Sequence, residues 1–212
     1  MCHRFDPGSS HIFFLLGYLS STLFSFPIPM KFVVAITGAS GSLYAQRLLE
    51  ALAATPHEVE VVTSSHAEEV AAAETGALAI PAKFARYGDR TMQVPFVSGS
   101  AKYDAMVIVP CSMGTLGRIA HGYSDSTITR AADVFLKERR PLLVVPREMP
   151  WNLLQARNVV SLLEAGATVL PACPSFYGRP QTVAEVADTV VARILDHLKV
   201  DHVLARRWKE KP

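Results

Sequence analysis

Apolar runs of strand length alternate along this chain with longer segments whose apolar residues recur at helical spacing. Strands are predicted at 32–37, 58–63, 105–109, 142–145 and 167–170. Helices are predicted at 43–54, 66–75, 127–139, 151–164 and 183–198. This alternation is typical of βαβ units, and so of a parallel sheet with helices on both faces. We therefore predict an α/β protein, a three-layer Rossmann-like or flavodoxin-like domain over residues 30–212.

Segment 81–102 interrupts this alternation between the second and third predicted strands. It has little periodicity and carries several Gly and Pro residues. A long loop inside a compact domain is often functional. We therefore expect a functional role for this excursion.

Residues 1–29 differ from the remainder of the chain. Residues 12–26 are mostly apolar or aromatic and follow Arg4, which resembles a secretory signal. The stretch is too short and too often broken by serine for a membrane span. Met30 directly precedes the first predicted strand, which favours Met30 as the true start, with 1–29 an over-extended start or a disordered tail. A genuine signal would instead predict cleavage within 25–29 and export.

Composition excludes several other classes of protein. Half of the 212 residues are hydrophobic and 19% are charged, which is ordinary for a globular α/β domain. The net charge of +2 gives no indication of a nucleic-acid or acidic membrane partner. The cysteines Cys2, Cys111 and Cys173 form no CxxC pair, which argues against a zinc site or a disulfide framework. A reducing, cytoplasmic location is expected.

Segment 38–42, Gly-Ala-Ser-Gly-Ser, lies between the first strand and its helix. Glycine allows close backbone approach, and a helix N-terminus attracts anions. The spacing is not GxGxxG, and Thr63, Ser64 and Ser65 end the second strand where a dinucleotide fold would carry an acidic residue. A mononucleotide therefore fits better than NAD. A well-capped turn without a ligand is the alternative.

Segment 110–115, Pro-Cys-Ser-Met-Gly-Thr, repeats this chemistry at the next strand end. Its hydroxyl groups can cap a helix or bind a phosphate. Two neighbouring strand ends with the same residue types favour a cofactor that carries a phosphate. Cys111 has no His near it in the sequence, so a small buried hydrophobe is favoured over a nucleophile.

Charged residues flank the apolar run 142–145. The basic segment 137–140 precedes it, and Arg147 and Glu148 follow it. Ligands of open α/β sheets bind outside the carboxyl ends of the strands. A cation and a carboxylate at such an end indicate a site for an anionic substrate with an acid/base group beside it.

The last candidate site combines Tyr177, in a loop closed by Gly178 and Pro180, with Arg193 of the closing helix. A tyrosine hydroxyl and a planar guanidinium can together clamp a phosphate. The alternative is a tyrosine packed at a loop corner and an arginine on a solvated helix face.

From Met30 to about Trp208 the chain resembles the flavin prenyltransferases (UbiX/Pad-type) of the flavoprotein homo-oligomer superfamily. The matching segments are TGASG at 37–41, AAETG at 72–76, VSGS at 97–100, PCSMGTL at 110–116, RAADVFLKERRPLLVVPREMP at 130–150, PSFYGRPQTV at 174–183 and VVARILD at 190–196. The resemblance implies metal-independent transfer of a dimethylallyl group from dimethylallyl monophosphate to N5 and C6 of reduced FMN. It also implies a homo-oligomer, with a dodecamer expected, whose prenylated FMN serves UbiD-type decarboxylases.

The resemblance also assigns residues to roles. Residues implied to hold FMN are Gly38, Ala39, Ser40, Ser64, Ser112, Met113, Gly114, Thr115 and Arg130. Residues implied to hold the allyl phosphate and the prenyl group are Ser98, Lys137, Arg147, Tyr177, Arg193 and Trp208, with Tyr177 and Arg193 coming from a neighbouring subunit. Residues implied to be catalytic are Glu148, Ser40 and Glu74. Glu148 would protonate the phosphate or relay the N5 proton, whereas Ser40 and Glu74 would assist proton loss from C6. For Trp208, packing on a neighbour is the alternative to covering an allylic cation.

Two other functions are weighed against this one. FMN-dependent cysteine decarboxylases of the same superfamily carry a catalytic His after the first strand and a PASANT-type motif. Here the only histidines between 30 and 99 are His57 and His66, and no such motif is present. A non-catalytic FMN carrier would not need Glu148 beside the cations, nor Glu74 near the glycine turn.

Overall fold

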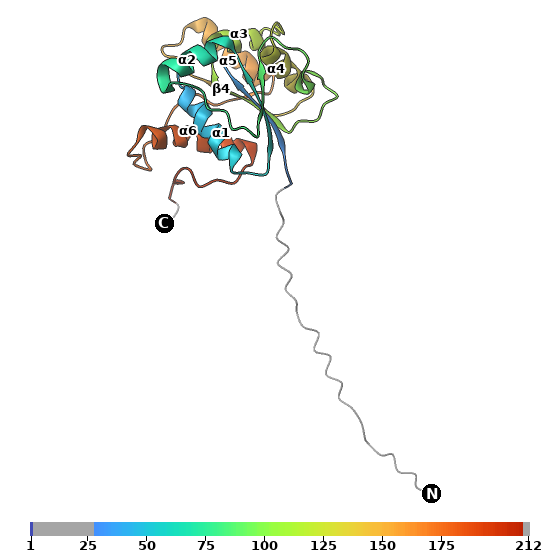
Figure 1. Cartoon of the computed structure of the whole chain (residues 1–212), viewed down its shortest axis with the longest axis vertical. Coiled ribbons are helices and arrows are strands. Elements are labelled where there is room, and N and C mark those ends of the chain that lie inside the picture. Colours follow the sequence, from blue (N-terminus) through green and yellow to red (C-terminus); the bar gives the residue numbers. More distant parts are fainter. Residues whose placement is uncertain (2–27, 210–212) are drawn as a thin grey trace.

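The computed structural model describes residue 1 and residues 28–209 (Figure 1). Its centre is a six-stranded sheet of parallel strands in the order β3-β2-β1-β4-β5-β6. The predictions for the leader at 1–29 fall, apart from its first and last two residues, outside this description. The strands are β1 (Lys31–Ile36), β2 (Glu58–Thr63), β3 (Ala85–Gly88), β4 (Ala105–Cys111), β5 (Leu142–Pro146) and β6 (Thr168–Val169).

Helices cover both faces of the sheet, which confirms the predicted fold class. Figure 1 shows α1 and α6 side by side, and these two helices contact each other. No helix within the described residues is long and apolar enough to span a membrane. The helices are α1 (Ser42–Ala53), α2 (Ser65–Thr75), α3 (Met113–Ala120), α4 (Thr127–Lys137), α5 (Leu153–Glu164) and α6 (Val183–Leu198), with a short 3-10 turn at Pro95–Val97.

Alternate residues of the central strands enter two separate apolar cores. Phe32 and Val34 of β1 pack with Leu48 of α1 and Ile194 of α6. Val33, on the opposite side of β1, belongs to the core that α3, α4 and α5 cover. The central strands are apolar along their whole length because both faces are buried. Their carboxyl ends are thereby fixed at one edge of the sheet.

The structure differs from the sequence-based prediction at several elements, and three of these differences bear on the site. The helix predicted at 127–139 ends at Lys137, and Arg139 has the left-handed φ of 53° that closes it. Helix α3 follows directly on segment 110–115 and was not predicted. Segment 81–102, for which the sequence predicts a long loop, also contains strand β3 and the 3-10 turn. β3 lies at the sheet edge with mostly exposed residues, so it lacks the apolar run that marks the other strands.

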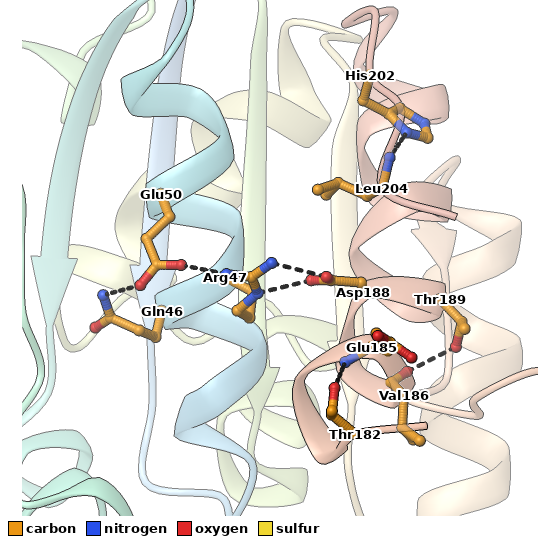
Figure 2. A network of polar contacts seen from close by, with 10 residues as sticks. All are labelled: Gln46, Arg47, Glu50, Thr182, Glu185, Val186, Asp188, Thr189, His202 and Leu204. Carbon is orange, nitrogen blue, oxygen red and sulfur yellow. Dashed lines mark hydrogen bonds and ion pairs between the residues drawn. The ribbon is translucent and has the colours of Figure 1, made fainter. Parts of the chain in front are cut away.

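A buried ion pair joins α1 to α6 (Figure 2). Arg47 donates two hydrogen bonds to Asp188, from Nε to Oδ1 at 2.8 Å and from Nη2 to Oδ2 at 2.7 Å. The Asp188 side chain is 8% exposed and that of Arg47 is 29% exposed. Arg47 also contacts the exposed Glu50 on its own helix. The bidentate geometry fixes the distance between the two helices on this face of the sheet.

Replacing Asp188 by Ala should lower the free energy of unfolding by about 2–3 kcal/mol. Removing one partner of a buried pair leaves the other charge uncompensated, and the partial exposure of Arg47 moderates that effect. For a chain of this length, the melting temperature should fall by about 4–12 °C. Glu50→Ala is the matched control, because loss of its exposed pair with Arg47 should change stability by about 1 kcal/mol or less. Equal melting temperatures for the two variants would contradict the assignment.

Candidate functional site

The carboxyl ends of β1 and β4 form the point at which the strand order reverses. Connections from β1 run outward to β2 and β3, whereas those from β4 run to β5 and β6. Thr37 bridges the two strand ends, because its hydroxyl donates to the Pro110 carbonyl at 2.9 Å and accepts from the Ser112 amide at 2.7 Å. Ligands of open α/β sheets bind at such a switch point.

A cavity of about 530 Å³ opens beside this point. Ser64, Ser112 and Ser126 are the N-cap residues of α2, α3 and α4, so three helices begin at the cavity wall. Its volume is within the range of small-ligand sites. The aligned amides at helix N-termini favour an anionic group. The cavity is lined by Gly38, Thr63, Ser64, Ser65, His66, Glu68, Gly88, Asp89, Arg90, Ser112, Thr115, Arg118, Asp125, Ser126 and Thr129.

Four residues predicted to bind a flavin, Gly38, Ser64, Ser112 and Thr115, line this cavity. Only glycine fits at position 38, because an added Cβ would lie 2.4 Å from the Cβ of His66, which packs against the turn. The other predicted cofactor residues do not line it. Ala39 and Met113 are buried. Ser40 and Gly114 are exposed and lie one or two residues in sequence from residues that line the cavity. Arg130 forms an ion pair with Asp133 on α4.

Sequence reasoning missed two arginines at the cavity wall. Arg118 Nε lies 3.4 Å from Asp125 Oδ2, and both side chains are more than half exposed. Arg90 makes no hydrogen bond or ion pair with any described residue. Arg118 stands one helical turn after Gly114, so recognition of α3 would have indicated it. Arg90 follows β3, and nothing in its surrounding sequence distinguished it.

Glu74 reaches from the end of α2 to the first turn of α1. Its carboxylate accepts hydrogen bonds from the Gly41 amide at 3.0 Å, and from the Ser42 amide and hydroxyl at 2.8 and 2.7 Å. Gly41 is the N-cap residue of α1, with a left-handed φ of 110° and no capping side chain. Glu74 therefore supplies from another helix the acceptor that an N-cap serine would normally provide.

These contacts set the ionisation of Glu74. Partial burial raises its pKa, but hydrogen bonds from the Ser40 and Ser42 side chains and from the Gly41 and Ser42 amides outweigh this effect. The pKa of Glu74 therefore lies below its ordinary value. Ser40 and Glu74, the pair predicted to act together, meet at the same turn, where the Ser40 side chain contributes to lowering the pKa of Glu74.

Replacing Glu74 by Gln should destabilise the protein by about 0.5–1 kcal/mol at pH 7, as expected for loss of a partly exposed cap. A lowered folded-state pKa gives stability that is fully present above the unfolded carboxyl pKa of about 4.3 and is lost as the pH falls through the folded value. The stabilities of wild type and variant should therefore converge in acid. Urea unfolding at pH 7 and at lower pH tests this, and a difference that grows in acid would contradict it.

Arg147 and Glu148 follow β5 at the same edge of the sheet. The Arg147 side chain crosses to the glycine turn, where its Nε donates to the Ser40 carbonyl at 2.8 Å. Ser40, Glu74 and Arg147 are thus brought together. Glu148 is exposed, and its carboxylate accepts only the neighbouring Met149 amide among described residues. Its second oxygen is open to a ligand at this strand end.

Lys137 lies at the opposite end of β5. It ends α4, before the strand begins at Leu142, whereas Arg147 follows the strand's last residue. Lys137 pairs with Glu138, and the two side chains pack over Gly99, where an added Cβ would lie 2.8 Å from Lys137 Nζ. Ser98 stands next to Gly99 and hydrogen-bonds Ser100. Within one chain, Lys137 therefore lies beside the turn at 98–100 and does not lie near Arg147.

Tyr177 and Trp208 form a third group. Their rings meet edge to face, with centroids 5.4 Å apart. Both side chains are substantially exposed, so the packing of Trp208 on Tyr177 leaves a face of each ring open. Arg193 of α6 is 61% exposed and donates from Nη1 to Asp196 Oδ2 at 2.6 Å. The predicted clamp residues therefore share one surface formed by α6, the loop before it and the C-terminal segment.

Cys111 is fully buried in the core that α3 and α4 cover. Burial raises the pKa of its thiol to about 12. A thiol with so little thiolate at neutral pH is a poor nucleophile. This confirms the interpretation of Cys111 as a small buried hydrophobe.

Comparison with known proteins agrees with this geometry. A family model described as Flavoprotein matches residues 28–195. The flavin prenyltransferase UbiX of Methanocaldococcus jannaschii is 44% identical over 185 residues, covering 84% of this chain and 98% of that protein. The UbiX of Pseudomonas aeruginosa is 41% identical over 201 residues, covering 86% of this chain and 96% of that protein. This chain belongs to the flavin prenyltransferase family of flavoproteins.

Solved structures give the same result. A dodecameric FMN-dependent UbiX-like decarboxylase from Escherichia coli O157:H7 superposes with a TM-score of 0.82 at 39% identity, over 85% of this chain and 100% of that one. AnUbiX (PadA1), in complex with FMN and dimethylallyl pyrophosphate, has a TM-score of 0.82 at 35% identity, over 87% and 100%. The resemblance, enzyme class and flavin cofactor expected from the sequence are thus confirmed. A PPC decarboxylase shares only the fold, at 22% identity and a TM-score of 0.55.

Proposed function

We propose that this protein transfers a dimethylallyl group from dimethylallyl monophosphate to N5 and C6 of reduced FMN. The single observation that carries the proposal is that Arg147, with Glu148 next to it in the sequence, hydrogen-bonds Ser40 of the glycine turn that Glu74 caps, two residues from the cavity-lining Gly38. It provides a cation for a phosphate and carboxylates for proton transfer within reach of a flavin-sized space. The prenylated FMN would serve a UbiD-type decarboxylase, with both enzymes in the cytoplasm.

The cavity is where we propose that the flavin binds. Ser64, Ser112 and Thr115 offer hydroxyl groups to its polar parts. Arg90 and Arg118 stand at the same wall as the carboxylates Glu68, Asp89 and Asp125, and Arg118 pairs with Asp125. Ala39, Met113, Gly114 and Arg130 would support the flavin from positions next to the cavity wall. The flavin supplies two nucleophilic ring atoms, N5 and C6. The chain's own contribution is to orient that ring and to keep its acceptor atoms near Ser40.

The allyl phosphate would bind between Arg147 of one chain and groups from neighbouring chains. Breaking the allylic C–O bond builds negative charge on the leaving phosphate, so cations held in advance stabilise the transition state more than the ground state. Glu148 would protonate the phosphate or relay the N5 proton. Ser40 and Glu74 would take up the C6 proton, and Glu74 is ionised at neutral pH because its pKa is lowered.

A homo-oligomer follows from the distribution of these groups. Lys137 and Ser98 lie at the opposite end of β5 from Arg147, and within the described part of the chain Tyr177, Arg193 and Trp208 make no hydrogen bond, ion pair or ring contact with Arg147. An exposed apolar patch next to Glu148 supports subunit contacts there. The related E. coli O157:H7 protein is a dodecamer, and we propose the same assembly here. The residues of the patch are Met149, Trp151, Leu153, Leu154, Val160 and Leu163.

Release of inorganic phosphate from dimethylallyl monophosphate tests the proposal. Under anaerobic conditions, release should require reduced FMN and should stop at one phosphate per flavin if the product stays bound. Oxidised FMN is the control and should give no release. Phosphate release that is independent of flavin would indicate a phosphatase and would contradict the proposal.

A further inference from the structure

Asp196, in the last turn of α6, accepts contacts from three basic side chains. Its Oδ2 lies 2.6 Å from Arg193 Nη1 on the same helix. Its Oδ1 lies 2.8 Å from Arg207 Nη2 and 3.2 Å from His202 Nε2, both in the segment that follows α6. A single carboxylate thus joins the proposed donor-binding arginine to the C-terminal segment.

The histidine contact has a defined direction. His202 Nδ1 accepts from the Leu204 amide at 3.4 Å, as the dashed line in Figure 2 marks. The proton of a neutral ring is then on Nε2, which donates it to Asp196. The His202 side chain is only 6% exposed. The contact therefore anchors the segment 200–209 at its beginning without needing a charged imidazole.

The anchored segment returns toward the loop that carries Tyr177. Arg206 Cβ lies 3.8 Å from the position of a Cβ on Gly178, and the Trp208 ring packs edge to face on Tyr177. Between these two contacts, Asp196 holds the segment through its bond with Arg207. Arg193, Tyr177 and Trp208, the three groups proposed to meet the donor on this surface, are therefore connected through one carboxylate.

The charges at Asp196 leave this surface suited to an anion. Arg193 and Arg207 carry two positive charges against the one negative charge of Asp196. Arg193 uses only Nη1 in this contact, so Nε and Nη2 keep N–H donors for a phosphate. Burial raises the pKa of Asp196, but bonds from Arg207 and His202 outweigh it and the pKa is lowered, so the carboxylate stays ionised.

We propose that Asp196 is a positioning residue for the prenyl donor, which fixes the Arg193 guanidinium and the segment bearing Trp208 as one unit. This rests on the proposed function, because it takes Arg193 and Trp208 as donor-binding groups. Without Asp196, two long arginine side chains and the terminal segment would have to be ordered at the moment of binding. That ordering reduces affinity.

The direction in which donor affinity changes distinguishes a positioning role of Asp196 from a purely electrostatic one. Asp196→Asn removes a negative charge beside an anion site, so a purely electrostatic role predicts tighter phosphate binding. A positioning role predicts weaker binding, by about tenfold. Asp196→Ala should weaken binding at least as much, and Asp196→Glu should restore part of it. Asp201→Asn is the matched control, because Asp201 is exposed in the same segment and makes no hydrogen bond or ion pair with a described residue.

The experiment measures the dissociation constant of dimethylallyl monophosphate by calorimetry on the oligomer loaded with oxidised FMN, on which no transfer occurs. Limited trypsin digestion at Arg206 and Arg207 provides the second readout. We expect Asp196→Asn to bind the donor about tenfold more weakly and to be cut faster, with FMN affinity and oligomer size unchanged.

Two results would overturn the inference. Donor affinity that is unchanged or improved would exclude a positioning role. A parallel loss of FMN affinity, oligomer size and melting temperature would indicate a structural role alone. If wild-type protein binds the monophosphate but Asp196→Asn behaves like Asp201→Asn, the inference fails while the proposed function stands. If the wild type binds no donor, the proposed function itself fails.

Discussion

Replacing Glu148 by Gln should lower the rate of prenyl transfer about 100- to 1000-fold and leave FMN affinity unchanged. The carboxylate stands at the carboxyl end of β5 next to Arg147, with one oxygen open to a ligand. A general acid or base contributes about 10²- to 10⁴-fold, and the amide cannot exchange the proton. Single-turnover rates with reduced FMN, together with flavin titrations, measure the two quantities separately.

Glu164→Gln is the control for this variant. Glu164 ends α5, is exposed, and its side chain makes no hydrogen bond or ion pair with a described residue. It should transfer the prenyl group at the wild-type rate. Wild-type turnover by Glu148→Gln as well would remove Glu148 from the proton-transfer chemistry. It would also favour the alternative of a protein that only carries FMN.

Replacing Lys137 by Ala should raise the KM for dimethylallyl monophosphate about 10- to 100-fold and spare FMN affinity. A hydrogen bond from a charged group to a phosphate contributes about 1.5–3 kcal/mol. Lys137 is half-exposed beside the 98–100 turn, away from the flavin cavity. Lys102→Ala, an exposed lysine nearby, is the control. A loss confined to FMN binding would contradict the role given to Lys137.

Mixed oligomers test whether the site is shared between chains. Lys137 and Glu148 lie toward opposite ends of β5, so a wild-type site would take Lys137 from one subunit and Glu148 from its neighbour. Oligomers assembled from equal amounts of Lys137→Ala and Glu148→Gln chains should recover about a quarter of the wild-type rate, because some sites then receive neither substitution. A mixture no more active than its parents would place both groups in the site of one chain.

The fold was largely predictable because its central strands are buried on both faces. β2 and α6 match their predicted limits, since an apolar run and a helical repeat each end at a clear polar boundary. β3 was missed because an edge strand has fewer side chains to bury. α3 was missed because its glycines at 114 and 117 mask its periodicity.

The site was predictable where residues follow a strand end, and less so elsewhere. Ser64 and Ser112 follow β2 and β4 and line the cavity, as expected from their positions. Lys137 and Arg147 are close in sequence, yet the strand between them spans about 13 Å. Glu74 can cap α1 because α2 packs against α1, and no local sequence pattern indicates that packing.

The most direct test of prenyl transfer is the mass of the flavin after reaction. The protein is incubated anaerobically with reduced FMN and dimethylallyl monophosphate, and the flavin is extracted and analysed by mass spectrometry. A flavin heavier by one C5H8 unit is the predicted result. Unmodified flavin from folded, FMN-loaded protein, with the monophosphate and then with the diphosphate donor, would contradict the proposed function.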